Sequence, residues 1–141
     1  MTANEYLSSV NRLNGMIKEK LDEVHMLKSK ATSTTISYGK DRVQCSCQYD
    51  KNADIIAQII DTDRDIDCLI DILVDTKRNI RYICKQMDSM QAVIIEKKYI
   101  EGKSLPKIAK EYGIKVGKVK YIHKKAVKSF EEIYLTTRYS V

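Results

Sequence analysis

From Thr2 to about Lys30, apolar residues recur at alternating steps of four and three positions. This heptad stripe contains Tyr6, Val10, Leu13, Ile17, Val24 and Leu27, with Lys20 at the one polar step. Such a stripe is typical of a helix that packs against another helix. Thr2 followed by Glu5 three residues later matches a capping box, so the pattern predicts a helix that begins near Thr2.

A second stripe runs from Lys51 to about Met87, with Asp50 as its expected N-cap. Its apolar members are Ile56, Ile59, Ile66, Ile70, Leu73, Ile80, Cys84 and Met87, and Asp63 and Lys77 occupy the two remaining steps. The intervening residues 31–50 are polar and rich in Thr and Ser, which predicts a long loop. Within this loop, Tyr38, Arg42 and Val43 are candidates for contact with a partner.

So narrow an apolar stripe does not keep a lone helix stable in water. We therefore expect the second helix to fold back antiparallel on the first. If the helices meet near residues 30 and 52, Lys20 faces Asp63 and Tyr6 lies near Lys77. The match of Lys20 with Asp63 favours this hairpin, because a charge on a seam is costly unless paired. A dimeric coiled coil would use the same stripe.

A break at Met87–Met90 separates this arm from the rest. Asp88 or Ser89 is expected to cap a helix from Met90 to about Glu101, with Val93, Ile94, Tyr99 and Ile100 as its apolar residues and Gly102 at its end. Ser104 and Pro106 then predict the start of a short helix. Its expected inner face comprises Ile108, Ala109 and Tyr112.

Gly113 is expected to end that helix with a positive φ, and Ile114 leads into a second helix, about Lys115 to Tyr134. Val119 and Ile122 fall on its inner face, and Ala109 allows the two helices to cross closely. Each position thus has a steric role in a helix-turn-helix, although an ordinary helical hairpin shares part of the pattern. We predict an all-α fold, with a hairpin arm over 1–88, a helix-turn-helix domain over 89–135 and a frayed tail over 136–141.

Charge separates the two predicted parts. Residues 1–88 hold 13 Lys/Arg and 14 Asp/Glu, whereas residues 89–141 hold 12 Lys/Arg and 5 Asp/Glu. A basic excess that coincides with a helix-turn-helix indicates a polyanion partner, namely double-stranded DNA. With the second helix in a major groove, we expect base contacts from a cluster at its exposed start: Lys115, Val116, Gly117, Lys120, Tyr121 and Lys124. The expected phosphate contacts are Lys103, Lys107, Lys118, Lys125 and Lys128.

The remaining composition narrows the class of protein. No apolar run is long enough to span a bilayer, and the start lacks a signal-peptide pattern, so we expect a cytoplasmic protein without membrane contact. The four cysteines suit reduced thiols, and Cys68 and Cys84 are expected to be small core residues. The Cys45-x-Cys47 pair lacks two further ligands, so no metal or cofactor is expected. We find no catalytic set, which argues against an enzyme.

The segment YIEGKSLPKIAKEYGIKVGKVKYIHKKAVKSFEE, residues 99–132, resembles region 4 of bacterial sigma factors. The shared order is an aromatic-x-Glu-Gly-x-Ser start, an Ile-Ala pair, a Gly-Ile turn and a recognition helix. Over nearly its whole length, the chain also resembles phage and prophage regulators of the ArpU and RinA type. Lys107 and Val116 depart from the sigma pattern, which commonly has acidic or small polar residues there, and no segment resembles region 2.

This resemblance implies a DNA-binding transcriptional regulator, of phage late genes, whose arm contacts RNA polymerase or a second copy of the chain. Two alternatives remain. A DNA-packaging factor, similar to a small terminase subunit, also joins a helix-turn-helix to helical assembly segments. The second alternative is a protein that has the same fold but binds RNA polymerase and makes no base contacts with DNA.

Overall fold

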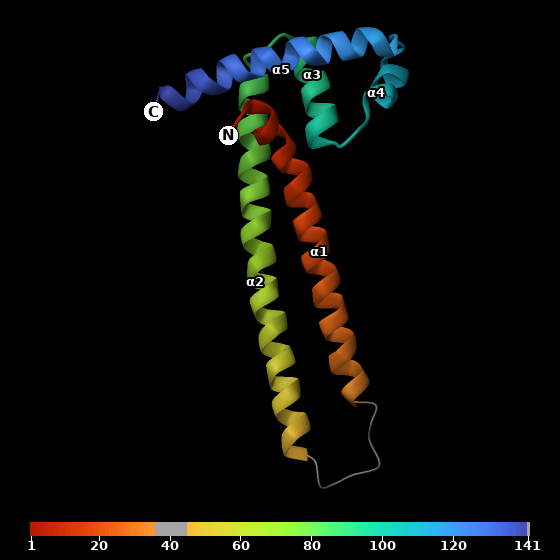
Figure 1. Ribbon diagram of the computed structural model, residues 1–141, viewed down its shortest axis with the longest axis vertical. Helices are drawn as coiled ribbons and strands as arrows, with labels where there is room; N and C mark the ends of the chain where they lie inside the picture. Colours follow the sequence, from red (N-terminus) through yellow and green to blue (C-terminus); the bar gives the residue numbers. More distant parts are fainter. Residues whose placement is uncertain (36–44, 141) are drawn as a thin grey trace. The chain divides into compact units, whose positions relative to one another are not determined.

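The structure, a computed structural model, describes residues 1–35 and 45–140, with the backbone alone for 33–35 and 45–50. Every regular element within these ranges is helical, so the predicted all-α class is confirmed. The elements are α1 (Ala3–Thr35), α2 (Cys45–Cys84), α3 (Ser89–Ile95), the π-helical turn η1 (Glu96–Ile100), α4 (Leu105–Tyr112) and α5 (Val116–Tyr139). The long helix α1 packs on α2 (Figure 1). No described helix is both long and apolar enough to cross a membrane.

The chain divides into two compact units. One unit comprises Asn14–Ile72, which is most of α1 and α2, and the other comprises Met1–Leu13 and Leu73–Val141. The second unit therefore joins the first turns of α1 and the last turns of α2 to the four C-terminal elements. This unit contains all the residues predicted to contact DNA.

The start of α1 confirms the predicted capping box. The Thr2 amide donates a hydrogen bond to Glu5 Oε2 at 2.8 Å, and the Glu5 amide donates to Thr2 Oγ1 at 3.3 Å. These bonds satisfy two amides that have no partner within the helix. The bond from the Thr2 backbone also holds the pKa of Glu5 below its usual value.

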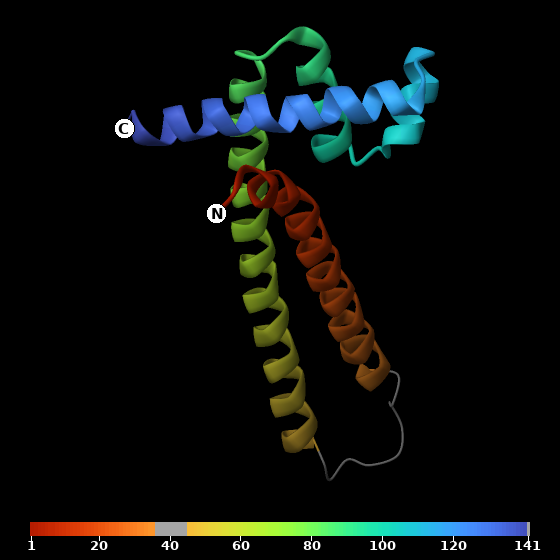
Figure 2. The ribbon, with the colours of Figure 1, turned by 45° about the horizontal axis from the view of Figure 1, so that its top comes forward.

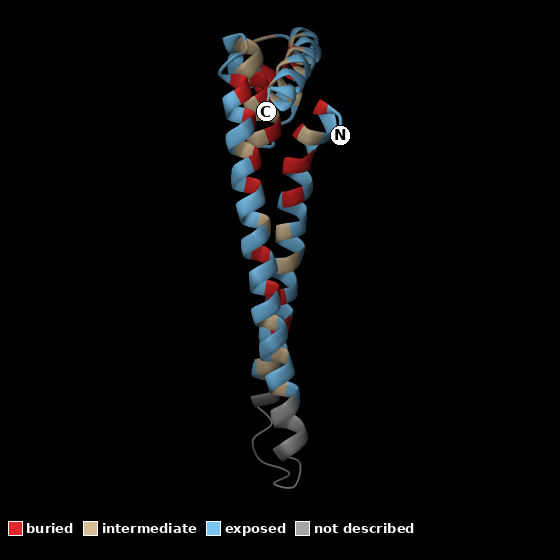
Figure 3. Cartoon of the chain, turned by 90° about the vertical axis from the view of Figure 1, so that its left-hand side faces the viewer, coloured by how far each residue is buried: buried red, intermediate tan, exposed pale blue. Residues whose placement is uncertain are grey.

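The predicted stripe of α1 is the face that is buried. Val10, Leu13, Val24 and Leu27 are buried, and Tyr6, Ile17 and Lys20 are half-buried. Figure 3 shows buried positions recurring along the facing sides of α1 and α2. Hydrophobic burial at heptad spacing thus accounts for the contact between these helices.

Both long helices extend into the segment 31–50 that was predicted to be a loop. Helix α1 continues to Thr35 and α2 begins at Cys45, so Asp50 lies inside α2 and is not its N-cap. Thr32 explains part of the difference, because its hydroxyl donates to the carbonyl oxygens of Ser29 at 2.9 Å and Lys28 at 3.1 Å. A threonine that bonds back to its own helix in this way need not interrupt it. Tyr38, Arg42 and Val43 lie outside the described residues.

The buried seam of α2 differs from the predicted one. Ile56 and Ile70, predicted to be buried, are 54% and 41% exposed. The observed seam of buried and half-buried residues also recurs at alternating steps of four and three positions. At every second position, it uses the residue immediately before the predicted one. Its members are Ile55, Ile59, Thr62, Ile66, Leu69, Leu73, Thr76, Ile80 and Ile83. The predicted seam was therefore wrong at Ile56 and Ile70, whereas Cys84 is buried as predicted, next to Ile83.

Desolvation explains why this seam is preferred. The predicted stripe would bury Asp63 and Lys77, whereas the observed stripe places Thr62 and Thr76 at the corresponding steps. The Thr62 hydroxyl donates to the Gln58 carbonyl oxygen at 2.8 Å, so its burial leaves no donor without a partner. A bonded hydroxyl costs far less to bury than an ionised side chain.

The register between the two helices also differs from the prediction. Lys20 Nζ lies 3.5 Å from Asp65 Oδ2, and Tyr6 is hydrogen-bonded to the Asn79 side chain. The predicted partners, Asp63 and Lys77, were therefore wrong by two residues. Lys20 is half-buried but Asp65 is exposed, so water screens their attraction and the pair contributes little to stability.

The two described thiols have different environments. Cys84 is a buried core residue, as predicted, and burial raises the pKa of its thiol to about 12. Cys68 was predicted to be buried, but it is exposed because it lies off the observed seam. The side chains of Cys45 and Cys47 lie outside the described residues.

The helix predicted from Met90 to Glu101 instead has two parts. Helix α3 begins at Ser89, with Asp88 at the N-cap position but without a side-chain capping bond, and ends at Ile95. It then widens into η1, in which the Glu101 amide bonds to the Glu96 carbonyl oxygen at 3.1 Å. Gly102, with φ of 73°, follows η1 as predicted. Helix α5 extends to Tyr139, five residues beyond the predicted end at Tyr134.

The seam assignment can be tested with two substitutions of the same type in α2. Ile66 is 6% exposed and Ile70 is 41% exposed, although the sequence pattern predicted both to be buried. We expect Ile66→Ala to lower the free energy of unfolding by about 2–4 kcal/mol, because it leaves a cavity in the seam. Ile70→Ala should cost less than about 1 kcal/mol. Urea unfolding followed by circular dichroism measures both, and equal losses would contradict the observed seam.

Candidate nucleic-acid interface

Helix α4 begins and ends at the residues that the sequence predicted. Ser104 occupies the N-cap position and Pro106 lies in the first turn, but the Ser104 side chain makes no capping bond. Gly113, with φ of 65°, follows the helix. The Gly113 amide bonds to the Lys110 carbonyl oxygen at 3.4 Å and the Ile114 amide to that of Ala109 at 2.9 Å. This pair of bonds is a Schellman motif, which turns the chain sharply from α4 into α5.

An apolar cluster holds α3, α4 and α5 together. Its members are each about 1% exposed: Ile94 from α3, Ile108 and Ala109 from α4, and Val119 from α5. Leu105, Ile114 and Ile122 pack around this cluster. Tyr112 was expected on the same inner face but is 42% exposed, and the Lys97 ammonium lies 5.6 Å from its ring centre. Figure 2 shows α3 and α4 beside the first half of α5.

Four charged side chains link η1, the following turn and α4. Lys97 Nζ lies 3.2 Å from Glu111 Oε1, and Lys103 Nζ lies 3.1 Å from both Glu111 Oε2 and Glu101 Oε2. The two glutamates raise the pKa of Lys103 well above its usual value. A phosphate that bound Lys103 would have to compete with both carboxylates.

The wider turn of η1 positions Tyr99 against the middle of α5. The Tyr99 hydroxyl lies 3.0 Å from His123 Nε2, and Lys98 Nζ lies 3.4 Å from the same nitrogen. Burial, and to a smaller extent the Lys98 charge, hold the pKa of His123 below its usual value. Burial also raises the pKa of Tyr99 and lowers that of Lys98. These contacts favour a neutral His123 that accepts a hydrogen bond.

Sequence reasoning missed this contact, although the residues carry a weak signal for it. Ile94 and Ile95 are both buried, and Tyr99 is buried five residues after Ile94. The step of five from Ile94 to Tyr99 fits one π-helical turn, but the step of four from Ile95 to Tyr99 fits an ordinary α-helix. Local deviations of this kind are commonest at functional sites, but a single step of five does not predict one.

The first half of α5 is strongly basic on its outer surface. Six lysines and no acidic residue lie between positions 115 and 128. All six side chains are exposed, whereas Val119 and Ala126 are buried on the opposite face. Like charges on one helix face repel one another, so this surface gains from binding an anion.

Four predicted contact residues meet at a shallow hollow of about 250 Å³ on this surface. Tyr121, Lys124, Lys125 and Lys128 line it. The Lys125 ammonium lies 4.8 Å from the centre of the Tyr121 ring, a cation–π contact that restrains both side chains. The hollow thus combines one aromatic surface with three ammonium groups and no carboxylate.

The other predicted contact residues are exposed along the same two helices. Lys115 is the N-cap residue of α5, where free backbone amides favour an anion. Val116, Gly117, Lys118 and Lys120 follow it on exposed positions of the first turns. Lys107 is exposed on α4, whereas Lys103 is held in ion pairs with Glu101 and Glu111.

Comparisons with known protein families, with curated proteins and with solved structures found no match to this chain. Its function must therefore be inferred from its own residues. Among the described side chains, no three His, Cys, Asp or Glu residues are grouped so that they could hold a metal ion.

The contact between His123 and Tyr99 predicts a pH dependence of stability. Because the folded state lowers the pKa of His123 below its usual 6.5, the unfolded chain binds a proton first as the pH falls. This contribution to stability is complete above about pH 6.5 and decreases as the pH falls below it.

We expect His123→Gln to lose this dependence, so the difference in unfolding free energy between the variant and the native protein should change between about pH 7.5 and 5.5. Urea unfolding at a series of pH values measures it. His25→Gln, in α1, is the matched control. A constant difference across this range would mean that His123 has the same pKa in both states.

Proposed function

We propose that this protein is a DNA-binding transcriptional regulator that reads the major groove with α5. In this proposal, α4, the turn at Gly113 and α5 form a helix-turn-helix similar to that of sigma factor region 4. Residues 89–135 would then be the DNA-binding part. The observation that carries the proposal is the outer face of α5, where five exposed lysines, with Lys115 at the N-cap, occur without an acidic residue up to position 128.

The packing of α5 supports this use. Val119 and Ala126 are buried, so the helix cannot turn its lysines away from solvent without exposing apolar surface. A single α-helix fits the major groove, and residues near its N-terminus meet the base edges. Lys120, Tyr121 and Lys124 are the side chains best placed to do so.

The remaining lysines suit the phosphate backbone. Lys118, Lys125 and Lys128 flank the proposed base contacts on α5, and Lys107 projects from the start of α4. Lys103 contributes less in this proposal than the sequence suggested, because its ammonium is already paired with Glu101 and Glu111. Lysine binds phosphate as a point charge and lacks the bidentate fork that arginine offers to guanine. The protein should consequently bind DNA tightly at low salt and discriminate modestly between sequences.

The biological setting is part of the same proposal. The resemblance to phage and prophage regulators of the ArpU and RinA type suggests control of late genes in a bacterial host. A protein that discriminates weakly between DNA sequences needs a second contact to select its sites, which RNA polymerase or another copy of the chain would supply. The stripe that was available for a dimeric coiled coil is largely buried between α1 and α2, so a dimer through that stripe would require the two helices to separate.

Salt dependence tests the proposed phosphate contacts. If about five phosphates are neutralised, log K plotted against log salt concentration should have a slope near −4 to −5. Lys128→Ala should weaken binding to all sequences alike and reduce the magnitude of the slope by about 1, because it removes one phosphate contact.

Lys120→Ala or Tyr121→Ala should instead change the sequence preference. Fluorescence anisotropy with labelled duplexes measures the slope, and selection of bound genomic fragments measures the preference.

Lys18→Ala, in α1, is the charge-matched control and should leave the slope unchanged. A salt-independent affinity would contradict the contact model.

Enrichment of fragments upstream of phage structural genes would favour the late regulator, whereas enrichment at a packaging start site, with ring assembly in solution, would favour a packaging factor. No binding to any duplex at low salt, with polymerase still captured, would favour a protein that binds polymerase alone.

Gly117 offers a separate test, because the fold does not require a glycine there. A Cβ added at Gly117 would meet no atom within 4 Å, and the same holds for Gly15 in α1. Alanine at either position should stabilise its helix by up to about 1 kcal/mol. If α5 enters the major groove, a bulky residue at position 117 lies against the DNA.

We therefore expect Gly117→Leu to weaken duplex binding by about tenfold, a cost of about 1.4 kcal/mol, while thermal unfolding remains unchanged or shifts upward. Gly15→Leu should leave binding intact. Equal binding by both variants would place the start of α5 outside the interface.

A further inference from the structure

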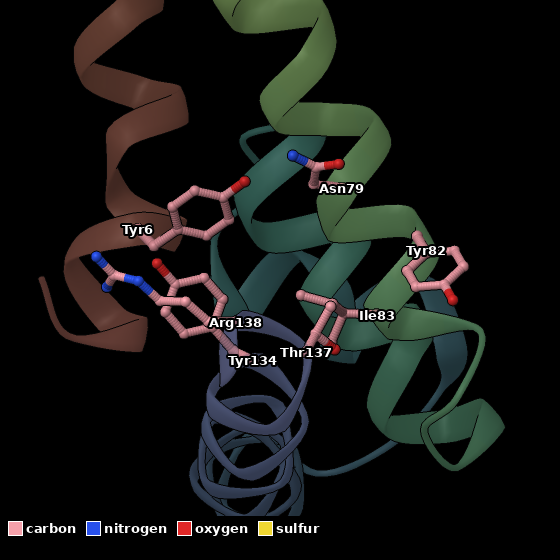
Figure 4. Close-up of a pocket in the computed structure, with 7 residues that line it drawn as sticks. All are labelled: Tyr6, Asn79, Tyr82, Ile83, Tyr134, Thr137 and Arg138. Atoms are coloured by element: carbon pink, nitrogen blue, oxygen red, sulfur yellow. The ribbon is translucent and has the colours of Figure 1, made fainter. Parts of the chain in front are cut away.

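A second recess lies between the first turns of α1, the last turns of α2 and the last turns of α5. Its volume is about 380 Å³, and we name it the tyrosine groove. Tyr6, Asn79, Tyr82, Tyr134, Thr137 and Arg138 form its walls, and Ile83 lies at its base. Figure 4 shows Tyr6, Tyr134 and Arg138 close together, with Asn79, Tyr82 and Ile83 presented by α2. All seven residues belong to the same compact unit.

The aromatic wall of the tyrosine groove is held rigidly. The rings of Tyr6 and Tyr134 stack with centres 4.9 Å apart and an angle of 29° between their planes. Tyr134 also stacks on Phe130, which is fully buried, at 6.2 Å. The Asn79 side chain is hydrogen-bonded to Tyr6. A wall that is already ordered loses little side-chain entropy when a ligand binds.

Exposed residues of kinds that are common in protein interfaces line the groove or follow its lining residues in the sequence. Tyr82 is 60% exposed and Tyr139, one residue after Arg138, is 83% exposed. Leu135, on the same last turns of α5, is 42% exposed. Tyrosine and arginine are the residues most enriched at the energetic centres of such interfaces, because each combines a large contact area with a polar end.

The charge of the groove's lining residues indicates which kind of ligand it would bind. Arg138 is the one cationic residue that lines the groove, and it has no acidic partner among the side chains that the structure describes. No acidic residue lines the groove. A cation beside hydroxyl and amide groups suits a carboxylate, which Arg138 can bind through two parallel hydrogen bonds.

We propose that the tyrosine groove docks an acidic segment of a partner protein, in which a carboxylate lies next to an aromatic or large aliphatic side chain. The carboxylate binds Arg138, and the apolar side chain packs on the Tyr82 ring above Ile83. This proposal does not depend on DNA binding. Lys120 and Arg138 are 18 residues apart on one helix, which corresponds to roughly 27 Å, so a duplex and the partner can be bound together.

Selection from a library of random linear peptides, followed by anisotropy with labelled copies of the enriched peptide, tests the proposal on the full chain. We expect enriched peptides to pair acidic residues with an aromatic or large aliphatic residue. Arg138→Glu and Tyr82→Ala should each weaken their binding by about tenfold or more. Both side chains are exposed, so circular dichroism should report an unchanged fold. Arg64→Glu reverses an exposed charge that does not line the groove and should have no effect.

Three outcomes would overturn the proposal. The first is a selection that enriches no acidic peptides, or peptides whose binding survives Arg138→Glu. The second is self-association in sedimentation that Arg138→Glu abolishes, since the occupant would then be segment 61–75 of a second copy, which contains six aspartates. The third is binding of single-stranded oligothymidine that Arg138→Glu abolishes and Lys124→Ala does not, since tyrosine and arginine also stack on bases.

The same variants separate this proposal from the proposed DNA contacts. Arg138→Glu should leave duplex binding unchanged, and Lys124→Ala should leave peptide binding unchanged. Loss of duplex binding in the native protein would therefore remove the proposed function and leave the groove in place.

Discussion

The contact of α5 with α3 and α4 is the constraint on which the candidate interface depends. Val119 meets Ile94, Ile108 and Ala109 in a cluster from which water is almost entirely excluded. Once this face is buried, the rotation of α5 about its own axis is set, and its lysines must face solvent. A residue larger than alanine at position 109 would separate the helices and alter that rotation, because a closely packed protein interior accommodates extra volume poorly.

A balance between apolar burial and charge desolvation determines how the long helices meet. Helix α2 has two stripes at heptad spacing, and both contain enough isoleucine and leucine to form a seam. One stripe contains Asp63 and Lys77, and the other contains Thr62 and Thr76. Taking two ions out of water costs several kcal/mol each, whereas a threonine satisfies its hydroxyl within its own helix. The second stripe is buried, and Ile56 and Ile70 of the first remain exposed.

Helix α5 carries two surfaces of different chemistry on its two halves. The first half offers ammonium groups around one tyrosine, and the second half offers an arginine among stacked tyrosines. Ammonium groups attract a diffuse polyanion at long range, with an affinity that salt reduces. An arginine beside ordered aromatic rings instead favours one carboxylate in one orientation. Each surface thus suits a different partner.

The sequence by itself determined the features that depend on neighbouring residues. The capping box of Thr2 and Glu5, the breaks at Gly102 and Gly113, the stripe of α1 and the short helix that begins after Ser104 all follow from local hydrogen bonds and backbone preferences. The exposed lysines of α5 could also be predicted, because Val119 and Ile122 define an inner face at helical spacing. Tyr121, Lys124, Lys125 and Lys128 were assigned to the interface on this basis, and they line one hollow.

Only the tertiary structure decided between alternatives that were locally equivalent. Both stripes of α2 have the same period, so the partner helix and the cost of burying ions selected one, and Ile56 and Ile70 became exposed as a result. The ion pair of Lys103 with Glu111 joins residues 8 positions apart, and the contact of Tyr99 with His123 joins residues 24 positions apart, beyond the reach of any local pattern. The tyrosine groove depends on Tyr6, Tyr82 and Tyr134, which are far apart along the chain. Such features arise from packing between elements, which periodicity along one element does not encode.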